Sequence, residues 1–440
     1  MTRILSGSCR TPKCGGFCWR VPPAQLSVKR LQLGGESRVN EVRINPMSNF
    51  AQVYRNSGVD WDRKIDRQHS ASLKWDGRKR LFGTEDVLPL WVADMDFAVP
   101  EAVQQALVDR AAHPVFGYTE ADGAAERALC LWWSRRHGWL IQPEWIELAP
   151  GVVPSLYAAV HVFTHQGDGV LIQTPVYPPF FSAISDLGRR CVENPLILGE
   201  EGYRIDWEHF ERVLPECRLF LLCSPHNPVG RAWTEPELRR MLQLCRLHGV
   251  QVVADEIHAD LMLAGQKHVA AGGLGEPGIV VFVAPSKTFN IPGLGLSAVV
   301  IEDPNLRQRW RSWSKQHPVN LHNPFSLLAF EVAYTKGEHW LDALLPYLTA
   351  NCDVVTEWLR GHQQGWVRGV PPQATYLYWL DFQALGLDGN ALQATLIKAG
   401  VGLSQGRTFG LQGEGFMRLN FALPRAELIQ ALHYMDRLCP

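Results

Sequence analysis

The sequence has no long apolar run and no excess of charge of either sign. Its 440 residues include 43 Lys and Arg against 44 Asp and Glu, a formal net charge of −1. So balanced a chain offers no basic surface for nucleic acid or for an anionic membrane. A membrane-spanning helix needs roughly 20 consecutive apolar residues, and no stretch of this sequence provides them. We therefore expect neither a nucleic-acid partner nor a membrane.

Cysteine is sparse as well, with ten residues in the chain. Cys9, Cys14 and Cys18 make an incomplete zinc set, and no nearby histidine completes it. The other seven lie scattered between Cys130 and Cys439 without metal-ligand spacing. This usage favours reduced thiols in a cytoplasmic protein and no metal site.

The first 46 residues differ in character from the rest of the chain. They hold eight Lys or Arg, two acids and no amphipathic period, so we predict a disordered extension over 1–46, with Met47 as the functional start. The arginine-rich, acid-poor bias also fits a transit peptide, whereas a secretion signal would need a hydrophobic core. The remaining length favours two or three domains at roughly 150 residues each.

Compact apolar runs alternate with helical patterns through the middle of the chain. The runs suit strands that are buried on both faces of a parallel sheet, and they cover 169–174, 218–223, 250–254 and 279–284. Between two of them, residues 234–248 carry a threonine N-cap, a proline in the first turn and a closing glycine, Gly249. Strands separated by helices predict an α/β fold.

The C-terminal part has a different pattern. Residues 307–359 are mostly helical, and 374–382 and 416–421 have the pattern of antiparallel strands in a smaller α+β domain. We predict three folded parts: an N-terminal arm with part of the small domain over 47–94, a large domain over 95–310, and the rest of the small domain over 311–440.

Three polar residues each follow one of the apolar runs. They are Lys287 after 279–284, Asp255 after 250–254, and Asn227 after 218–223. Open α/β sheets bind ligands at the carboxyl ends of their strands. A lysine for a Schiff base, an acid for the pyridine nitrogen and an amide for the ring oxygen are what pyridoxal phosphate (PLP) needs. Taken singly, Lys287 could be a surface charge, and Asp255 could be a helix N-cap.

These segments, in this order and spacing, resemble the fold-type I PLP enzymes of the aspartate aminotransferase superfamily over about 61–438. The resemblance implies a large PLP domain with a mostly parallel sheet and a smaller α+β domain. Four segments resemble most closely the MalY/PatB branch of cystathionine β-lyases, or C–S lyases: Trp91–Phe97, Gly151–Pro154, Asp255–His258 and Ser286–Pro292.

The resemblance implies a role for each residue around the cofactor ring. Lys287 would form the Schiff base and remove the substrate Cα proton, and Asp255 would hold the pyridine nitrogen protonated. Tyr177 would stack on the ring and complete the catalytic group. Asn227 and His258 would contact the ring oxygen, where the aminotransferases usually carry tyrosine in place of His258. Tyr177 as a core aromatic and His258 as a satisfied core histidine remain open alternatives.

Further residues are implied at the phosphate and at the substrate. The backbone N–H groups of the turn that opens a helix would bind the phosphate, aided by the Ser286 hydroxyl and by Tyr118 from the partner of a homodimer with shared active sites. Arg418 would bind the substrate carboxylate through two hydrogen bonds, and Asp94 would lie near the entrance, unless it only caps a turn. Gly295 replaces the arginine that clamps the phosphate in aminotransferases. The turn that opens the helix supplies Gly151, Val152 and Val153.

The activity that this resemblance implies is β-elimination from cystathionine or related cysteine S-conjugates, releasing a thiol, pyruvate and ammonia. An L-amino-acid aminotransferase is the alternative. A ligand-sensing, non-catalytic relative fused to a DNA-binding domain is a third reading. The N-terminal 46 residues disfavour it, because they show no helix-turn-helix pattern.

Overall fold

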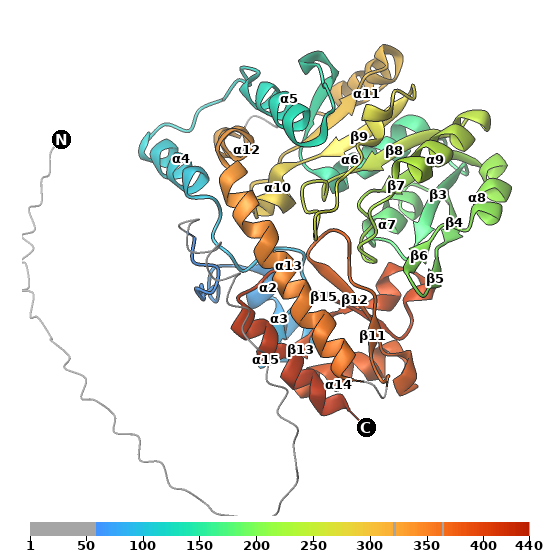
Figure 1. Ribbon diagram of the computed structural model, residues 1–440. Coiled ribbons are helices and arrows are strands. Elements are labelled where there is room, and N and C mark those ends of the chain that lie inside the picture. The colour runs from blue at the N-terminus through green and yellow to red at the C-terminus, as the bar shows by residue number, and fades with distance from the viewer. Residues whose placement is uncertain (1–58, 320–322, 363–364, 440) are drawn as a thin grey trace, which may run out of the picture. The chain divides into compact units, whose positions relative to one another are not determined.

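The structure is a computed structural model that describes residues 59–319, 323–362 and 365–439, and it contains a sheet of seven strands (Figure 1). The predictions for 1–46 and for the first residues of the arm lie outside this range. The strand order is β2 (Ile146–Ala149), β10 (Ser297–Ile301), β9 (Ile279–Val283), β8 (Gln251–Asp255), β7 (Cys217–Cys223), β3 (Gly169–Thr174) and β4 (Arg190–Pro195). Within this sheet β10 alone runs in the direction opposite to the other strands, so the predicted mostly parallel sheet is confirmed.

Alternate residues of the central strands pack into two different apolar clusters, one on each face of the sheet. Val253 of β8 packs in the cluster that includes residues of α6 and α7. Its neighbours Val252 and Ala254 pack in the cluster that includes residues of α5 and α9. Helices on both faces explain why these strands are apolar throughout, as buried parallel strands require.

Helix α9 (Glu235–Leu247) begins and ends where its sequence signals predict. The Thr234 hydroxyl accepts from the Glu237 N–H at 3.4 Å, and the Glu237 carboxylate accepts from the Thr234 N–H at 2.8 Å. This reciprocal pair satisfies two backbone donors that the helix itself cannot. The other α-helices are α2 (Leu73–Asp76), α3 (Arg78–Phe82), α4 (Glu101–Ala112), α5 (Ala124–His137), α6 (Val152–Phe163), α7 (Pro179–Ser185), α8 (Trp207–Val213), α10 (Pro285–Thr288), α11 (Pro304–Gln316), α12 (Pro324–Lys336), α13 (Glu338–Gly361), α14 (Gly389–Ala399) and α15 (Arg425–Met435).

A second sheet is formed by the C-terminal part of the chain. Its antiparallel order is β11 (Arg368–Gly369), β12 (Leu377–Asp381), β15 (Phe416–Asn420) and β14 (Ser404–Gln405). Strand β1 (Leu88–Pro89) pairs in parallel with β13 (Val401–Gly402), which joins the N-terminal arm to this part of the chain. A hairpin of β5 (Ile197–Gly199) and β6 (Gly202–Arg204) completes the strands. The boundaries between the three predicted parts stay a prediction.

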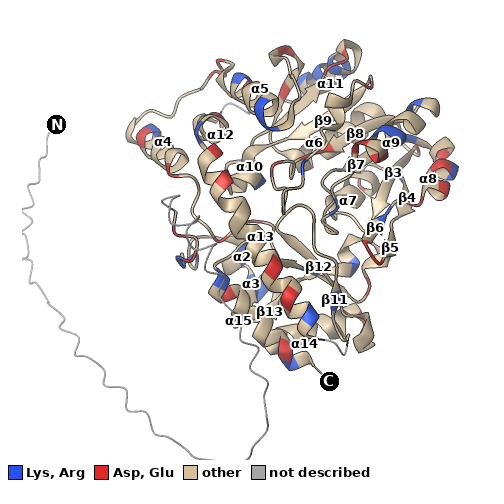
Figure 2. Cartoon of the chain, in the orientation of Figure 1, with Lys and Arg blue, Asp and Glu red and all other residues tan. Residues whose placement is uncertain are grey.

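Positions of Lys and Arg and positions of Asp and Glu are interspersed along the helices in the cartoon of Figure 2. Within the described ranges, no helix combines the length and apolar character that crossing a bilayer requires.

Candidate active site

The register of the large sheet brings three of the predicted site residues, Asn227, Asp255 and Lys287, to one edge. Asp255, the last residue of β8, pairs with Cys223 on β7 and with Phe282 on β9. The segment that leads to Asn227 therefore leaves the sheet on one side of Asp255, and the turn that carries Lys287 leaves it on the other. Parallel strands place these three chain exits at the same edge.

The Asp255 carboxylate is buried and poorly satisfied. Its Oδ1 accepts from the Ile257 backbone N–H at 3.1 Å, the one hydrogen bond recorded for this carboxylate within the described chain. Burial raises the pKa of Asp255 to about 7, although the Ile257 N–H and the charge of Lys287 act in the opposite direction. A buried acid in this state is suited to a cationic N–H partner, which would stabilise its charged form.

Lys287 lies on the single turn of α10, directly after β9. Its Nζ donates to the Ala93 carbonyl oxygen at 2.7 Å. Burial, followed by the charge of Arg418, lowers the pKa of Lys287 to about 8, even though Asp94 and Asp255 oppose the shift. A substantial fraction of this amine is therefore neutral near physiological pH and can act as a nucleophile or a base.

Arg418 is a buried cation on β15 whose hydrogen-bond partners are all neutral. It donates to Asn227 Oδ1 at 3.0 Å, to the Trp91 carbonyl at 2.8 Å and to Ser404 Oγ at 3.3 Å. Its Nε has no partner, and no carboxylate pairs with it within the described chain. Burial lowers the pKa of Arg418 to about 10. A buried guanidinium without a counter-ion is costly, so the site fits an anionic ligand.

His258 and Tyr177 lie close to these charges. Burial, with the charges of Lys287 and Arg418, lowers the pKa of His258 to about 3, so its ring is neutral. Within the described residues its Nδ1 has no hydrogen-bond partner. Tyr177 is half-buried; burial raises its pKa, and both Arg418 and Asp255 act on it electrostatically. Neither residue is therefore a fully satisfied member of the core.

The turn before α6 has the geometry of an anion cradle. Gly151 is the N-cap of α6 and has φ 151°, a conformation that favours glycine. The N–H groups of Val152 and Val153, in the first turn, have no acceptor within the helix. Gly295 lies beside this turn, since a Cβ added to it would stand 3.5 Å from the Pro150 oxygen. Ser286 is half-buried in α10, next to Lys287.

Asp94 lies in a cluster of ion pairs. Arg67 contacts both Asp94 oxygens, at 3.1 and 2.7 Å, and its Nη1 also contacts Asp96 at 2.6 Å. Lys74 contacts Asp96 at 2.6 Å and Asp94 Oδ1 at 3.8 Å. These bonds tie the N-terminal arm to the segment 91–97. The predicted place of Asp94 at the substrate entrance stays a prediction.

Tyr118 is fully exposed, on the segment between α4 and α5. No hydrogen bond or ring contact recorded in the described part of the chain joins it to Lys287 or to the α6 turn. Its predicted role across a dimer stays a prediction.

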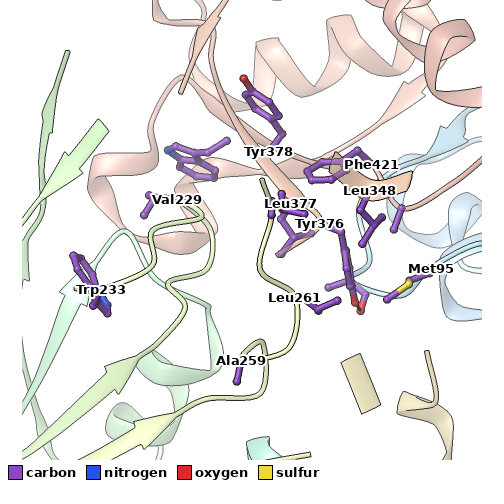
Figure 3. Close-up of a cluster of buried hydrophobic side chains, with 14 of the residues drawn as sticks. Met95, Val229, Trp233, Ala259, Leu261, Leu348, Tyr376, Leu377, Tyr378 and Phe421 are labelled. Atoms are coloured by element: carbon purple, nitrogen blue, oxygen red, sulfur yellow. Dashed lines mark hydrogen bonds between the residues drawn. The ribbon is translucent and has the colours of Figure 1, made fainter. Parts of the chain in front are cut away.

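Sequence reasoning missed one residue at the centre of the site, Tyr376. Its hydroxyl donates to the Ala93 oxygen at 2.9 Å, the same oxygen that holds Lys287. Its ring meets that of His258 edge-on, with centroids 6.2 Å apart. Figure 3 shows Tyr376 between Leu261 and Met95. Its place inside a predicted strand offered no signal that distinguished it from a core aromatic.

Comparison with known proteins identifies the family of this chain. The family model for aminotransferase class I and II matches residues 85–435, and the chain belongs to this family. It is 43% identical over 380 residues to cystathionine beta-lyase PatB of Bacillus subtilis, covering 85% of this chain and 98% of that protein. It is 36% identical to protein MalY of Escherichia coli, covering 84% of this chain and 96% of that protein. The crystal structure of cystalysin from Treponema denticola, which contains a pyridoxal 5'-phosphate cofactor, is 34% identical, with a TM-score of 0.83 over 86% of this chain and 98% of that one.

Proposed function

We propose that this protein is a PLP-dependent lyase that cleaves the Cβ–S bond of cystathionine or a related cysteine S-conjugate, yielding a thiol, pyruvate and ammonia. The observation that carries the proposal is that Lys287 and Asp255, at one edge of the large sheet, lie close to Arg418 of β15, which has no carboxylate partner among the described residues. The similarity to PatB, MalY and cystalysin supports this reading of the site.

The groups left unsatisfied at this edge fit PLP. The Asp255 carboxylate suits a pyridinium N–H, the neutral His258 ring has an unpartnered Nδ1, and the first N–H groups of α6 suit a phosphate. The half-buried Tyr177 supplies an aromatic face beside Asp255. When bound, PLP supplies an electron sink for the negative charge that develops at the substrate Cα.

The chain's own residues orient the substrate and move its proton. Arg418 would bind the substrate carboxylate, exchanging its neutral partners for a charged one. Lys287, with a pKa of about 8, would take the Cα proton at Nζ. The Ala93 carbonyl already holds this amine at 2.7 Å and would accept a hydrogen bond from the ammonium that forms. Departure of the thiolate from Cβ then completes the elimination.

The experiment that tests this function separates elimination from amino transfer. Purified protein supplied with PLP and L-cystathionine should release pyruvate and ammonia in equal amounts, with no keto acid added. Lys287→Ala is the matched control and should release neither. Conversion of an added keto acid into its amino acid, without release of ammonia, would instead support an aminotransferase and refute the lyase.

We further propose that the protein works as a cytoplasmic homodimer with shared active sites. Support for the dimer comes from Val115, Phe116 and Tyr118, exposed on one segment far from Lys287 in sequence. Apolar side chains exposed together commonly mark an interface. The seven described cysteines are free thiols, as a reducing compartment would favour.

A mixture of two inactive variants tests the shared site. Lys287→Ala and Tyr118→Asp would each be inactive alone. A hybrid dimer would contain one site with both changes and one site with neither, so activity should return after subunit exchange. If exchange is demonstrated and activity stays absent, Tyr118 does not serve the partner's site.

A further inference from the structure

The segment Trp91–Asp94 holds both cations of the site through its backbone. The Trp91 carbonyl accepts from Arg418 Nη2 at 2.8 Å and from Ser404 Oγ at 2.8 Å. The Ala93 carbonyl accepts from Lys287 Nζ at 2.7 Å and from the Tyr376 hydroxyl at 2.9 Å. Each of these two carbonyls therefore holds one functional cation and one neutral hydroxyl.

The two other carbonyls of this segment both accept from the Asn420 side chain, and the Asp94 carbonyl also accepts from Lys74 Nζ at 3.3 Å. Asn420 Nδ2 donates to the Val92 and Asp94 carbonyls, at 2.6 Å each, and Asn420 Oδ1 accepts from the Ala422 N–H at 2.8 Å. The Asn420 backbone N–H donates to the Leu90 carbonyl at 2.9 Å. Asn420 is fully buried, two residues after Arg418 on β15, so the segment is fixed to the strand that carries Arg418.

We propose that Trp91–Asp94 is a backbone template that sets Lys287 and Arg418 relative to each other, with Tyr376 and Ser404 as separate positioning residues for the two cations. Tyr376 acts on Lys287 through the Ala93 carbonyl. Ser404 acts on Arg418 through the Trp91 carbonyl and through its own Oγ, which accepts from Arg418 at 3.3 Å. The proposal deepens the proposed function and rests on it, because it assigns the lysine to proton transfer and the arginine to carboxylate binding.

The backbone beside Tyr376 supports this role. Thr375 has φ 73°, which is strained for a β-branched residue and persists only where the surroundings enforce it. Its N–H donates to the Leu261 carbonyl at 2.7 Å, and its hydroxyl accepts from the Leu377 N–H at 3.1 Å. The Tyr376 hydroxyl is thus directed at the Ala93 carbonyl from a fixed support.

A rigid template predicts that the two hydroxyls have separable effects. Misplacing the base slows proton transfer without weakening substrate binding, whereas misplacing the arginine weakens binding of the carboxylate. A merely structural role would instead make both losses run in parallel, because both hydroxyls bind the same four-residue segment.

The test compares Tyr376→Phe with Ser404→Ala in the full chain supplied with PLP. The base is followed by NMR as exchange of the L-alanine Cα proton in heavy water at saturating alanine, since alanine has no Cβ–S bond. The arginine is followed by calorimetry as binding of 3-(methylthio)propanoate, which has the carboxylate but no amine. Ser404→Thr, which keeps the hydroxyl, is the matched control.

We expect Tyr376→Phe to slow exchange about 3- to 10-fold, as for the loss of one hydrogen bond, and to change the affinity for the carboxylate less than about twofold. Ser404→Ala should weaken binding of the carboxylate about 3- to 10-fold and change the exchange rate less than about twofold. Ser404→Thr should restore binding. Parallel losses in both variants, or no loss in either, would overturn the template. Normal exchange without pyruvate from cystathionine would refute the proposed lyase alone. No exchange in the unsubstituted protein would overturn both.

Discussion

Two carboxylates on one short segment, Asp255 and Asp260, are both buried yet have opposite surroundings. Asp255 faces Lys287 and has one backbone N–H donor, and burial raises its pKa to about 7. Burial would raise the pKa of Asp260 too, but His137, Thr288 and Trp132 hold it below the usual range. These three side chains bond Asp260 at 2.8, 2.9 and 2.9 Å.

The contrast separates residues that hold the site from residues that act in it. Asp260 is satisfied by the protein itself, and through Thr288 it fixes the turn that carries Lys287. Glu256 behaves likewise, since it accepts from His268 at 2.9 Å and from the Ala271 N–H at 2.8 Å. Among the residues that the structure describes, Asp255 has no such side-chain partner. A buried charge left without partners costs stability, and such costs cluster at functional sites.

The largest expected effect is the loss of activity when a residue that acts in the reaction is removed. Lys287→Ala should lower pyruvate release from cystathionine at least roughly 1,000-fold, because the base itself is removed. The melting temperature of the cofactor-free protein should fall little, since the one side-chain hydrogen bond that Lys287 makes within the described residues is the bond to Ala93. If the variant kept a tenth of the pyruvate release, Lys287 would not be the base that takes the Cα proton.

On the supporting side, Asp260→Asn should destabilise the protein. The amide nitrogen cannot accept from the donors around it, so we expect the free energy of unfolding to fall by about 2 kcal/mol. Urea denaturation of the cofactor-free protein measures this change. A loss below about 0.5 kcal/mol, the range of an ordinary surface substitution, would contradict the supporting role.

Asp255→Asn, in contrast to Asp260→Asn, should stabilise the cofactor-free protein. The pKa of Asp255 is raised on folding, so its ionisation costs stability as pH rises from its unfolded value, about 4, to its folded value, about 7. The variant avoids that cost. Its melting temperature should exceed that of the unsubstituted protein more at pH 8 than at pH 5, while lyase activity is lost. If the difference in melting temperature between the two proteins were equal at both pH values, folding would not raise the pKa of Asp255.

The pH dependence of PLP binding tests the protonation state of the Lys287 amine, which also acts in the site. Burial lowers the pKa of Lys287 to about 8, and its neutral amine, present above that pKa, is the reactive form. The rate at which the cofactor-free protein combines with PLP, followed by absorbance, should therefore rise with a midpoint near pH 8. A midpoint above pH 10 would indicate an ordinary solvated lysine.

The smallest expected effect concerns Tyr118. If its hydroxyl donates to the phosphate in the partner's site, Tyr118→Phe should weaken PLP binding by about 1 kcal/mol or somewhat more, because the acceptor is charged. Equilibrium titration of the cofactor-free protein measures this. Unchanged affinity would leave Tyr118 without a role at the phosphate.

Compact apolar runs predicted much of the large sheet. The run 169–174 has the same bounds as β3. The other three runs match β7, β8 and β9 to within one residue at each end. The strands 374–382 and 416–421 contain β12 and β15, paired as predicted. Edge strands such as β2 and β4 were not recognised, because their shorter or partly exposed sequences carry a weaker pattern.

The polar residues at the strand ends could be predicted from the sequence, because each follows an apolar run directly and belongs to a residue type that PLP chemistry needs. Tyr376, Ser404 and Asn420 were not, since their roles depend on carbonyls more than 280 residues away in sequence. Backbone carbonyls have no sequence signature of their own. The cluster of Arg67, Lys74, Asp94 and Asp96 was hidden for the same reason, since only tertiary contact pairs these charges.

Borohydride reduction of the PLP-loaded protein, followed by peptide mapping, tests the central claim most directly. Lys74 and Lys287 both lie near the segment 91–97: Lys74 is buried and paired with Asp96 at 2.6 Å, whereas Lys287 is bound to a neutral carbonyl. The account predicts that the reduced cofactor is attached to Lys287 and that Lys287→Ala abolishes the attachment. A modified peptide that contains Lys74 or any other lysine would contradict the assignment of the whole site.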